Sequence, residues 1–267
     1  MRTDVKRRGW TISAEGNDLA DRFLESVFFT GNGRMGARGY PAYRPIRRPL
    51  DAGLFLAGFY DRISDSTELT DFVNLPTPIW YQIRLNGRIP AIPSHLSRAL
   101  DLRTGLLTFR YRLSIADDWV DVQEQRFFSL AKPSFLFQRL EFQGRGQVEL
   151  LAGIDHKSCN SPIPDDQVKE NTQIIQMTRF CSGEATDAGF TARYKTNHTR
   201  LELAQTVSCR TEGFSSPAFV ADTGDGVGVR CTSDASDAPI ALEIAARLTS
   251  SRDVDPLLQL DVEPGWD

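Results

Sequence analysis

A glycine-rich segment is the first place where the residue types of this chain could do chemistry. Gly31 to Gly36 reads Gly-Asn-Gly-Arg-Met-Gly and matches the GxGxxG pattern of dinucleotide-binding loops. That pattern needs a helix after the glycines, and the three prolines between residues 41 and 49 disfavour a helix of useful length. We therefore expect no nicotinamide or flavin cofactor. The segment is expected to pass close to other backbone or to a ligand, with Asn32, Arg34 and Arg38 projecting from it.

The stretch from Gly31 to Asp61 supplies the candidate site residues. It is dense in Gly, Arg and Pro, and loops of this kind on a rigid scaffold often carry function. We expect Asn32 and Arg38 to hold the loop through hydrogen bonds to backbone, and to face a substrate only secondarily. Asn32, Arg34, Arg38 and Asp61 are therefore candidates for a substrate cleft or a structural loop. No residue of the chain is expected to be catalytic.

Three other polar segments have simple explanations. Arg44, Arg47 and Arg48 carry the guanidinium groups that bind anions, but we favour a solvated loop. The segment from Asp222 to Gly226 fills too few positions of a calcium loop and is expected to be a turn. The polar loop from Asp155 to Asn171 breaks the strand pattern and is a second place where function could lie.

The spacing of histidines and cysteines predicts no metal site. His95, His156 and His198 are far apart in sequence and show neither HxH nor HExxH spacing. Aldose epimerases of sandwich fold use scattered histidines, so an epimerase stays open as an alternative. The cysteines form no CxxC pair, and we expect them to be reduced residues of strands. They are Cys159, Cys181, Cys209 and Cys231.

Length and composition indicate an ordinary globular protein. The chain has 267 residues, of which 40% are hydrophobic and 25% charged, enough for a real core. The net charge of −4 gives no general attraction to nucleic acid or to anionic lipid, so neither is expected as a partner. No apolar run approaches the ~20 residues of a membrane helix. The first residues lack the apolar centre of a secretory signal, so we expect a cytoplasmic location.

Period-two alternation predicts strands over most of the chain. In Leu107 to Ile115, apolar residues alternate with Thr108, Arg110, Arg112 and Ser114, which puts one face inward and the other outward. The same pattern, regular or weaker, predicts strands at Ile79–Leu85, Val120–Phe128, Phe135–Phe142, Val148–Ile154, Ile174–Phe180, Phe190–Lys195, Leu201–Cys209, Val227–Thr232 and Ile240–Leu248.

Turn residues separate these runs, and helical periodicity is scarce. Short helices are expected only at Leu19 to Phe28 and near Ser94 to Leu100. Strands do not alternate with helices, so a doubly wound parallel sheet is disfavoured. The expected fold is mainly β, with two large antiparallel sheets packed face to face and few short helices. Turns are predicted at Asn86–Gly87, Thr104–Gly105, Asp117–Asp118, Gly144–Gly146 and Thr223–Gly226.

The N-terminal half resembles the opening of glycoside hydrolase family 65 proteins. Their N-terminal domain carries an E-S-x-F-x-x-G-N-G-x-x-G-x-R-G run, which Glu25 to Gly39 follows. Asp155 and Asn160 are similar to a later Asp-Gly…Asn stretch, with His156 in place of the usual Gly. The acidic residue that often follows the glycine run is absent here. Further pieces in the family's order are Trp10–Ile12, Leu56–Asp61, Leu75–Pro78, Leu100–Leu107 and Arg126–Leu130.

The resemblance implies a galactose mutarotase-like β-supersandwich that belongs to a larger enzyme. Family members include phosphorylases of maltose, trehalose, kojibiose and nigerose, and some hydrolases of α-glucosides. Their layout is an N-terminal sandwich, a linker helix, an (α/α)6 barrel and a small C-terminal β domain. The general-acid Glu and the phosphate-binding residues lie in and around the barrel, so inorganic phosphate is expected only as a co-substrate of the intact enzyme.

We therefore interpret residues 1–267 as one domain, with a lead-in at 1–20, a sandwich at 21–250 and the start of the linker at 251–267. The domain is expected to pack on the absent barrel and to help shape the cleft for an α-glucoside disaccharide. The resemblance also implies a possible homodimer. The alternatives are a free-standing sugar-binding sandwich or a mutarotase-like epimerase. Aromatic side chains available for stacking on a sugar are Trp10, Trp80, Trp119 and Trp266.

Overall fold

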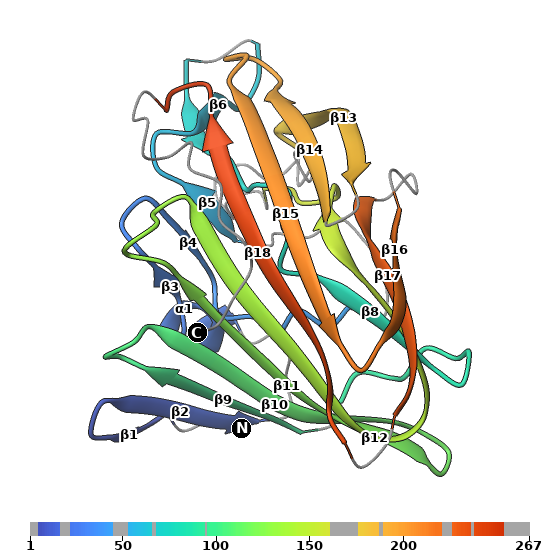
Figure 1. The fold of residues 1–267 in the computed structure, drawn as a ribbon. Coiled ribbons are helices and arrows are strands. Elements are labelled where there is room, and N and C mark those ends of the chain that lie inside the picture. The colour runs from blue at the N-terminus through green and yellow to red at the C-terminus, as the bar shows by residue number, and fades with distance from the viewer. Residues whose placement is uncertain are drawn as a thin grey trace, which may run out of the picture.

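A computed structural model describes residues 5–16, 22–44, 53–65, 68–93, 95–160, 176–186, 189–220, 226–235 and 238–253. The described chain is almost entirely antiparallel β structure, as the sequence predicts. One long sheet crosses the molecule from β1 at the lower left of Figure 1 to β13 at the upper right. A second layer branches from it through strand β12.

The strands of the long sheet follow in a fixed order. Along the sheet they are β1 (Lys6–Arg8), β2 (Thr11–Gly16), β9 (Leu96–Asp101), β10 (Leu106–Ile115), β11 (Asp118–Phe128), β12 (Phe135–Asp155), β18 (Ile240–Ser250), β15 (Glu202–Glu212), β14 (Gly189–Thr196) and β13 (Thr178–Thr186). The second layer contains β8 (Tyr81–Leu85), β17 (Gly226–Ala235) and β16 (Ser215–Val220).

Short elements cover one side of these layers. They are the helix α1 (Arg22–Val27), a small sheet of β3 (Thr30–Gly31), β4 (Met35–Ala37) and β5 (Leu54–Leu56), and the pair β6 (Tyr60–Arg62) and β7 (Thr70–Phe72). In the part of the chain that the structure describes, no helix has the length and apolar character needed to cross a membrane.

Strand β12 joins the two layers because it bends at a glycine. Up to Arg145 it pairs with β11, and from Gly146 onward it pairs with β17, while β8 pairs along its other side. Gly146 has φ of 112°, which side chains disfavour. The predicted turn at Gly144–Gly146 is therefore wrong. The two strands expected on either side of it are one strand, since the glycines bend the chain and do not reverse it.

The core lies where the sequence pattern places it. Leu107, Phe109 and Leu113 of β10 are fully buried, and the polar residues between Phe109 and Ile115 point outward. Burying each such side chain contributes roughly 1.5–3 kcal/mol. The pattern misses the second buried face of β18, where Ala245 packs against Phe135 and Phe137 outside the main core.

Several expectations fail for identifiable reasons. Residues near Ser94 to Leu100 form β9 and no helix, because Leu96, Arg98 and Leu100 all point inward and Arg98 is a charge in an apolar row. The helix expected at Leu19 to Phe28 is present as α1, although its first residues lie outside the described part. The alternation pattern also predicts none of the short strands β1 to β7 and does not predict β16. Arg47, Arg48, Asp222, Trp266, most of the Thr223–Gly226 turn and Ser161 to Asn171 also fall outside the described residues.

We predict that Gly146→Ala destabilises the fold at the bend of β12. A Cβ at Gly146 would meet the positive φ and would lie 3.0 Å from the Leu85 side chain. The free energy of unfolding, measured by urea denaturation, should fall by about 1–3 kcal/mol. The control is Gln147→Ala, at the exposed next position. Equal stability of the two variants would contradict the proposed role of Gly146.

Candidate functional site

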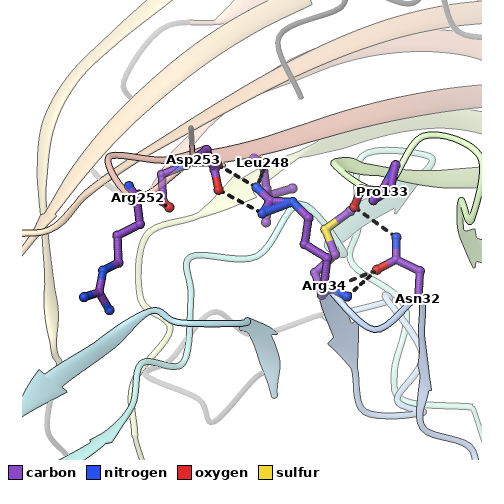
Figure 2. A network of polar contacts seen from close by, with 8 residues as sticks. Asn32, Arg34, Pro133, Leu248, Arg252 and Asp253 are labelled. Carbon is purple, nitrogen blue, oxygen red and sulfur yellow. Dashed lines mark hydrogen bonds and ion pairs between the residues drawn. The ribbon is translucent and has the colours of Figure 1, made fainter. Parts of the chain in front are cut away.

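Asn32 holds the turn between β3 and β4 by using both ends of its amide. The Oδ1 atom accepts hydrogen bonds from the backbone N–H groups of Arg34 and Met35, at 3.1 and 3.0 Å. The Nδ2 atom donates to the carbonyl oxygens of Ser129 and Pro133, at 2.8 and 3.0 Å. These are the backbone contacts that the sequence predicts for Asn32. They tie the glycine-rich turn to the turn between β11 and β12 (Figure 2).

Arg34 fastens the same turn to the end of β18. Its Nη1 and Nη2 atoms donate to the two carboxylate oxygens of Asp253 at 3.0 and 2.6 Å, and Nη2 also donates to the carbonyl of Leu248. The side chains of Arg34 and Asp253 are 15% and 12% exposed, so water screens the pair only partly. Figure 2 shows the guanidinium facing the Asp253 carboxylate. Arg34 therefore acts as a clamp within the domain.

The glycines of the motif are required by close packing. A Cβ on Gly36 would lie 2.7 Å from the Phe29 ring, and one on Gly39 would lie 2.3 Å from Cβ of Phe28. Gly33 is required for a different reason, because its φ of 86° in the turn is a conformation that glycine adopts readily and other residues rarely adopt. The GxGxxG-like pattern thus reflects backbone and rings packed against each other.

Arg38 contributes mainly through its backbone. Its N–H donates to the Gly53 carbonyl at 3.0 Å, and its own carbonyl accepts a hydrogen bond from Arg126 Nη2 at 2.8 Å. The Cγ and Cδ atoms of Arg38 lie so close to Gly53 that a Cβ there would be 2.6 Å away. Arg38 is thereby part of the packing beneath the loop.

Asp61 lies in a second polar cluster, around the turn between β14 and β15. Its buried carboxylate accepts hydrogen bonds from the backbone N–H groups of Asn197, His198 and Thr199, at 2.9, 3.1 and 2.7 Å. Thr199 Oγ1 also donates to the carbonyl of Tyr60 at 3.0 Å. Asp61 therefore shapes a turn, as Asn32 does.

The three histidines have separate surroundings. His156 Nδ1 is 2.6 Å from the Tyr194 hydroxyl, and its ring lies 4.4 Å from the Phe180 ring. His198 Nδ1 is 2.8 Å from an Asp65 carboxylate oxygen. Among the described residues, no group of three His, Cys, Asp or Glu side chains could hold a metal ion.

The cysteines are free thiols, as predicted, but Cys159 lies after the end of β12 and not in a strand. Burial raises the pKa of the Cys209 thiol and raises the pKa of Cys231 to about 12. Both thiols are therefore protonated near neutral pH and unreactive.

Sequence reasoning missed a buried polar row on the inner face of the long sheet. Glu124 accepts hydrogen bonds from the Ala42 N–H, at 2.7 Å, and from the Tyr111 hydroxyl, which is also bonded to Tyr81. Burial raises the pKa of Glu124, and burial followed by the charge of Glu124 raises the pKa of both tyrosines. The signal was available, because Glu124 shares the inward phase of its strand with Val120 and Val122.

Arg126 and Arg44 complete this interior. The Arg126 guanidinium lies 5.0 Å from the Tyr40 ring and 5.2 Å from the Phe109 ring, and burial lowers its pKa. Arg44 Nη1 is 3.5 Å from Asp155 Oδ2, and both side chains are buried. The expectation that Arg44 lies in a solvated loop is therefore wrong, since its charge is paired inside the protein.

The fold and these clusters define an antiparallel β-sandwich domain. The polar side chains of its loops, such as Asn32, Arg34 and Asp61, form hydrogen bonds within the domain itself. The comparison with known proteins agrees with this architecture. Residues 15–262 match the model of the glycosyl hydrolase family 65, N-terminal domain, and the chain belongs to this family.

One curated protein and two solved structures are similar to this chain over different extents. Trehalose 6-phosphate phosphorylase of Lactococcus lactis is 25% identical over 123 residues, which is 42% of this chain and 16% of that protein. A putative kojibiose phosphorylase from the human microbiome superposes with a TM-score of 0.73 at 13% identity, over 96% of this chain and 34% of that one. A heparinase III structure scores only 0.37, at 12% identity over 80% of this chain and 32% of that one. The chain thus spans about a third or less of the length of these proteins.

We predict that Asp253→Asn lowers the free energy of unfolding by about 1–3 kcal/mol, because it leaves a largely buried guanidinium without its counter-charge. The matched control is Asp121→Asn. Asp121 makes the same two-pronged contact with Arg112, but both side chains are more than half exposed, so its loss should change stability little. Urea denaturation of both variants measures the difference. Equal losses would refute the clamp.

A second prediction concerns the pH dependence of stability. The raised pKa of Glu124 means that its stabilising contribution is full below the ordinary value of 4.5 and is lost as the pH rises through the raised pKa. Glu124→Gln removes this titration. The stability of this variant relative to wild type should therefore increase as the pH rises above 4.5.

The control variant for this titration is Glu202→Gln. The Lys195 ammonium lowers the pKa of the exposed Glu202, so its contribution is present above the ordinary pKa and is lost on acidification. Relative stability should then change with pH in the opposite direction. Urea denaturation in steps from pH 4 to 8 tests both, and a flat difference for Glu124→Gln would contradict the assignment.

Proposed function

We propose that this domain is the non-catalytic N-terminal part of an enzyme that acts on α-linked glucosyl disaccharides. It packs on the catalytic (α/α)6 barrel and helps to shape the substrate cleft. Residues 21–250 hold most of the sandwich, but β1 and β2 of the expected lead-in are also strands of the long sheet, and residues 251–267 begin the linker. The observation that carries the proposal is the family match over residues 15–262, together with two relatives named as phosphorylases.

The contacts of the candidate residues favour a structural role. Asn32, Arg34 and Asp61 form hydrogen bonds with backbone groups and with Asp253, so they position turns. In an inverting phosphorylase a general acid protonates the glycosidic oxygen while phosphate attacks from the opposite face. We place that acid and the phosphate site in the barrel, with phosphate as the co-substrate. Free cysteines are compatible with a cytoplasmic enzyme.

The test compares the product of the complete open reading frame with residues 1–267 alone. With phosphate and maltose, trehalose, kojibiose or trehalose 6-phosphate, the complete product should release a sugar phosphate or, for a hydrolase, free glucose. Residues 1–267 should do neither, because positioned acid and nucleophile supply most of such a rate. Turnover by residues 1–267, or a stop codon after Asp267, would overturn the proposal.

A sugar-binding module is the second candidate, and one surface favours it. A hollow of about 490 Å³ on the outer side of β9 to β12 is lined by planar polar groups, including Arg110, Asp121 and Gln123, which suit vicinal hydroxyl groups. Of the expected tryptophans, Trp80 is buried, so its stacking role is wrong, while Trp119 lies under the Arg112 guanidinium at 4.0 Å. Sub-millimolar binding of a disaccharide in calorimetry would favour this candidate.

A further inference from the structure

One end of the long sheet gathers the turns that hold both polar clusters. The pairing of Leu107 with Arg126 puts the β9–β10 turn beside the β11–β12 turn, and the pairing of Phe135 with Arg247 puts the end of β18 beside them. The pairing of Leu203 with Ser250 adds the β14–β15 turn, which Asp61 holds. We call this end, with the β1–β2 and β3–β4 turns and the β6–β7 pair, the turn edge. It runs along the left and top of Figure 1.

Direct contacts join these turns into one surface. The Leu102 N–H donates to the Trp10 carbonyl at 2.8 Å, which links the β9–β10 turn to the β1–β2 turn. Asn32 links the β3–β4 turn to the β11–β12 turn, and Arg34 links it to Asp253. Arg252 Nη1 donates to the Gly58 carbonyl at 3.0 Å, which links the end of β18 to the turn before β6.

The turn edge exposes large apolar side chains. Ten such side chains are exposed in the described part of the chain, and five of them belong to this edge. They are Trp10 at 54%, Leu69 at 67%, Phe72 at 41%, Leu102 at 46% and Leu130 at 80% exposed. Exposed apolar groups that gather in one region mark a contact surface, and aromatic residues are enriched in such contacts.

We propose that the turn edge is the surface on which the catalytic domain of the same polypeptide packs. This inference rests on the function proposed above. Strand β18, the last described element, ends at this edge at Ser250, and Arg34 holds Asp253 there. The matched kojibiose phosphorylase is about three times as long as the part this chain covers, 34% of it, so a domain large enough to cover the edge is available.

Under this proposal, the Arg34–Asp253 clamp keeps the docking surface rigid. Arg34 and Asn32 tie the end of β18 and the β11–β12 turn to the same short hairpin, so the edge is rigid before anything docks on it. A rigid surface loses little conformational entropy on docking. Leu130, the most exposed of the five, lies in the turn that Asn32 holds.

The experiment uses Leu130→Glu, with Ile92→Glu as the matched control. Ile92 is 57% exposed and lies in the connection between β8 and β9, which enters β9 at the end opposite the β9–β10 turn. In residues 1–267 alone, neither variant should shift the melting temperature, because both side chains are exposed. In the complete enzyme, Leu130→Glu should speed proteolytic separation of the two domains about tenfold, and Ile92→Glu should not.

Each outcome decides the proposal. It is overturned if the two variants behave alike in the complete enzyme, or if residues 1–267 dimerise and Leu130→Glu abolishes the dimer, since the occupant is then a second copy. Leu102→Glu, at a neighbouring turn of the edge, should reproduce the effect of Leu130→Glu. If the complete protein lacks activity on α-glucosides yet Leu130→Glu still separates its domains, the proposed function fails and the docking surface stands.

Discussion

The structure depends on the charged contact between Arg34 and Asp253. These residues are 219 positions apart, and they meet only when the β3–β4 hairpin and the last described strand are both in place. A guanidinium and a carboxylate that are largely shielded from water stabilise each other only with good geometry, and the two parallel hydrogen bonds supply it. The pair thus couples the β3–β4 hairpin to the end of β18, and the hydrogen bonds of Asn32 and Arg252 add further links between neighbouring turns.

The coupling of the β3–β4 hairpin to β18 explains the glycine-rich motif. The hairpin that presents Arg34 to Asp253 packs Gly36 against the Phe29 ring and leads to Gly39 beside Phe28, so neither glycine has room for a Cβ atom. The pattern that suggests a phosphate-binding loop is therefore a consequence of backbone packing. The polar residues that remain in the motif satisfy turns, as Asn32 does with four backbone groups.

Alternation predicts most of the fold because antiparallel strands with one buried face repeat every second residue. It fails where a buried position holds a charge or where a strand leaves its sheet. The charge of Arg98 interrupts the apolar alternation of β9, so the inward face is not recognised. Gly146 is typical of a turn in the sequence, although β12 continues through it. The loop role of Asn32 follows from residue type and neighbours. The Arg34 contact could not be predicted, because nothing local in the sequence identifies a partner as distant as Asp253.

The buried charges explain why the domain needs its N-terminal segment. Glu124 and Arg126 face the core, where isolated charges are costly, and residues 38 to 43 supply a carbonyl, an N–H and the Tyr40 ring to them. Without this segment, the Glu124 carboxyl and the Arg126 guanidinium on the inner face of β11 would lose these polar contacts in apolar surroundings. The β3–β4 hairpin that carries Arg34 directly precedes this segment, so the residues that contact the buried charges are continuous in the chain with those that hold the turn edge. A disturbance at either place is therefore expected to reach the other through a few covalent bonds of backbone.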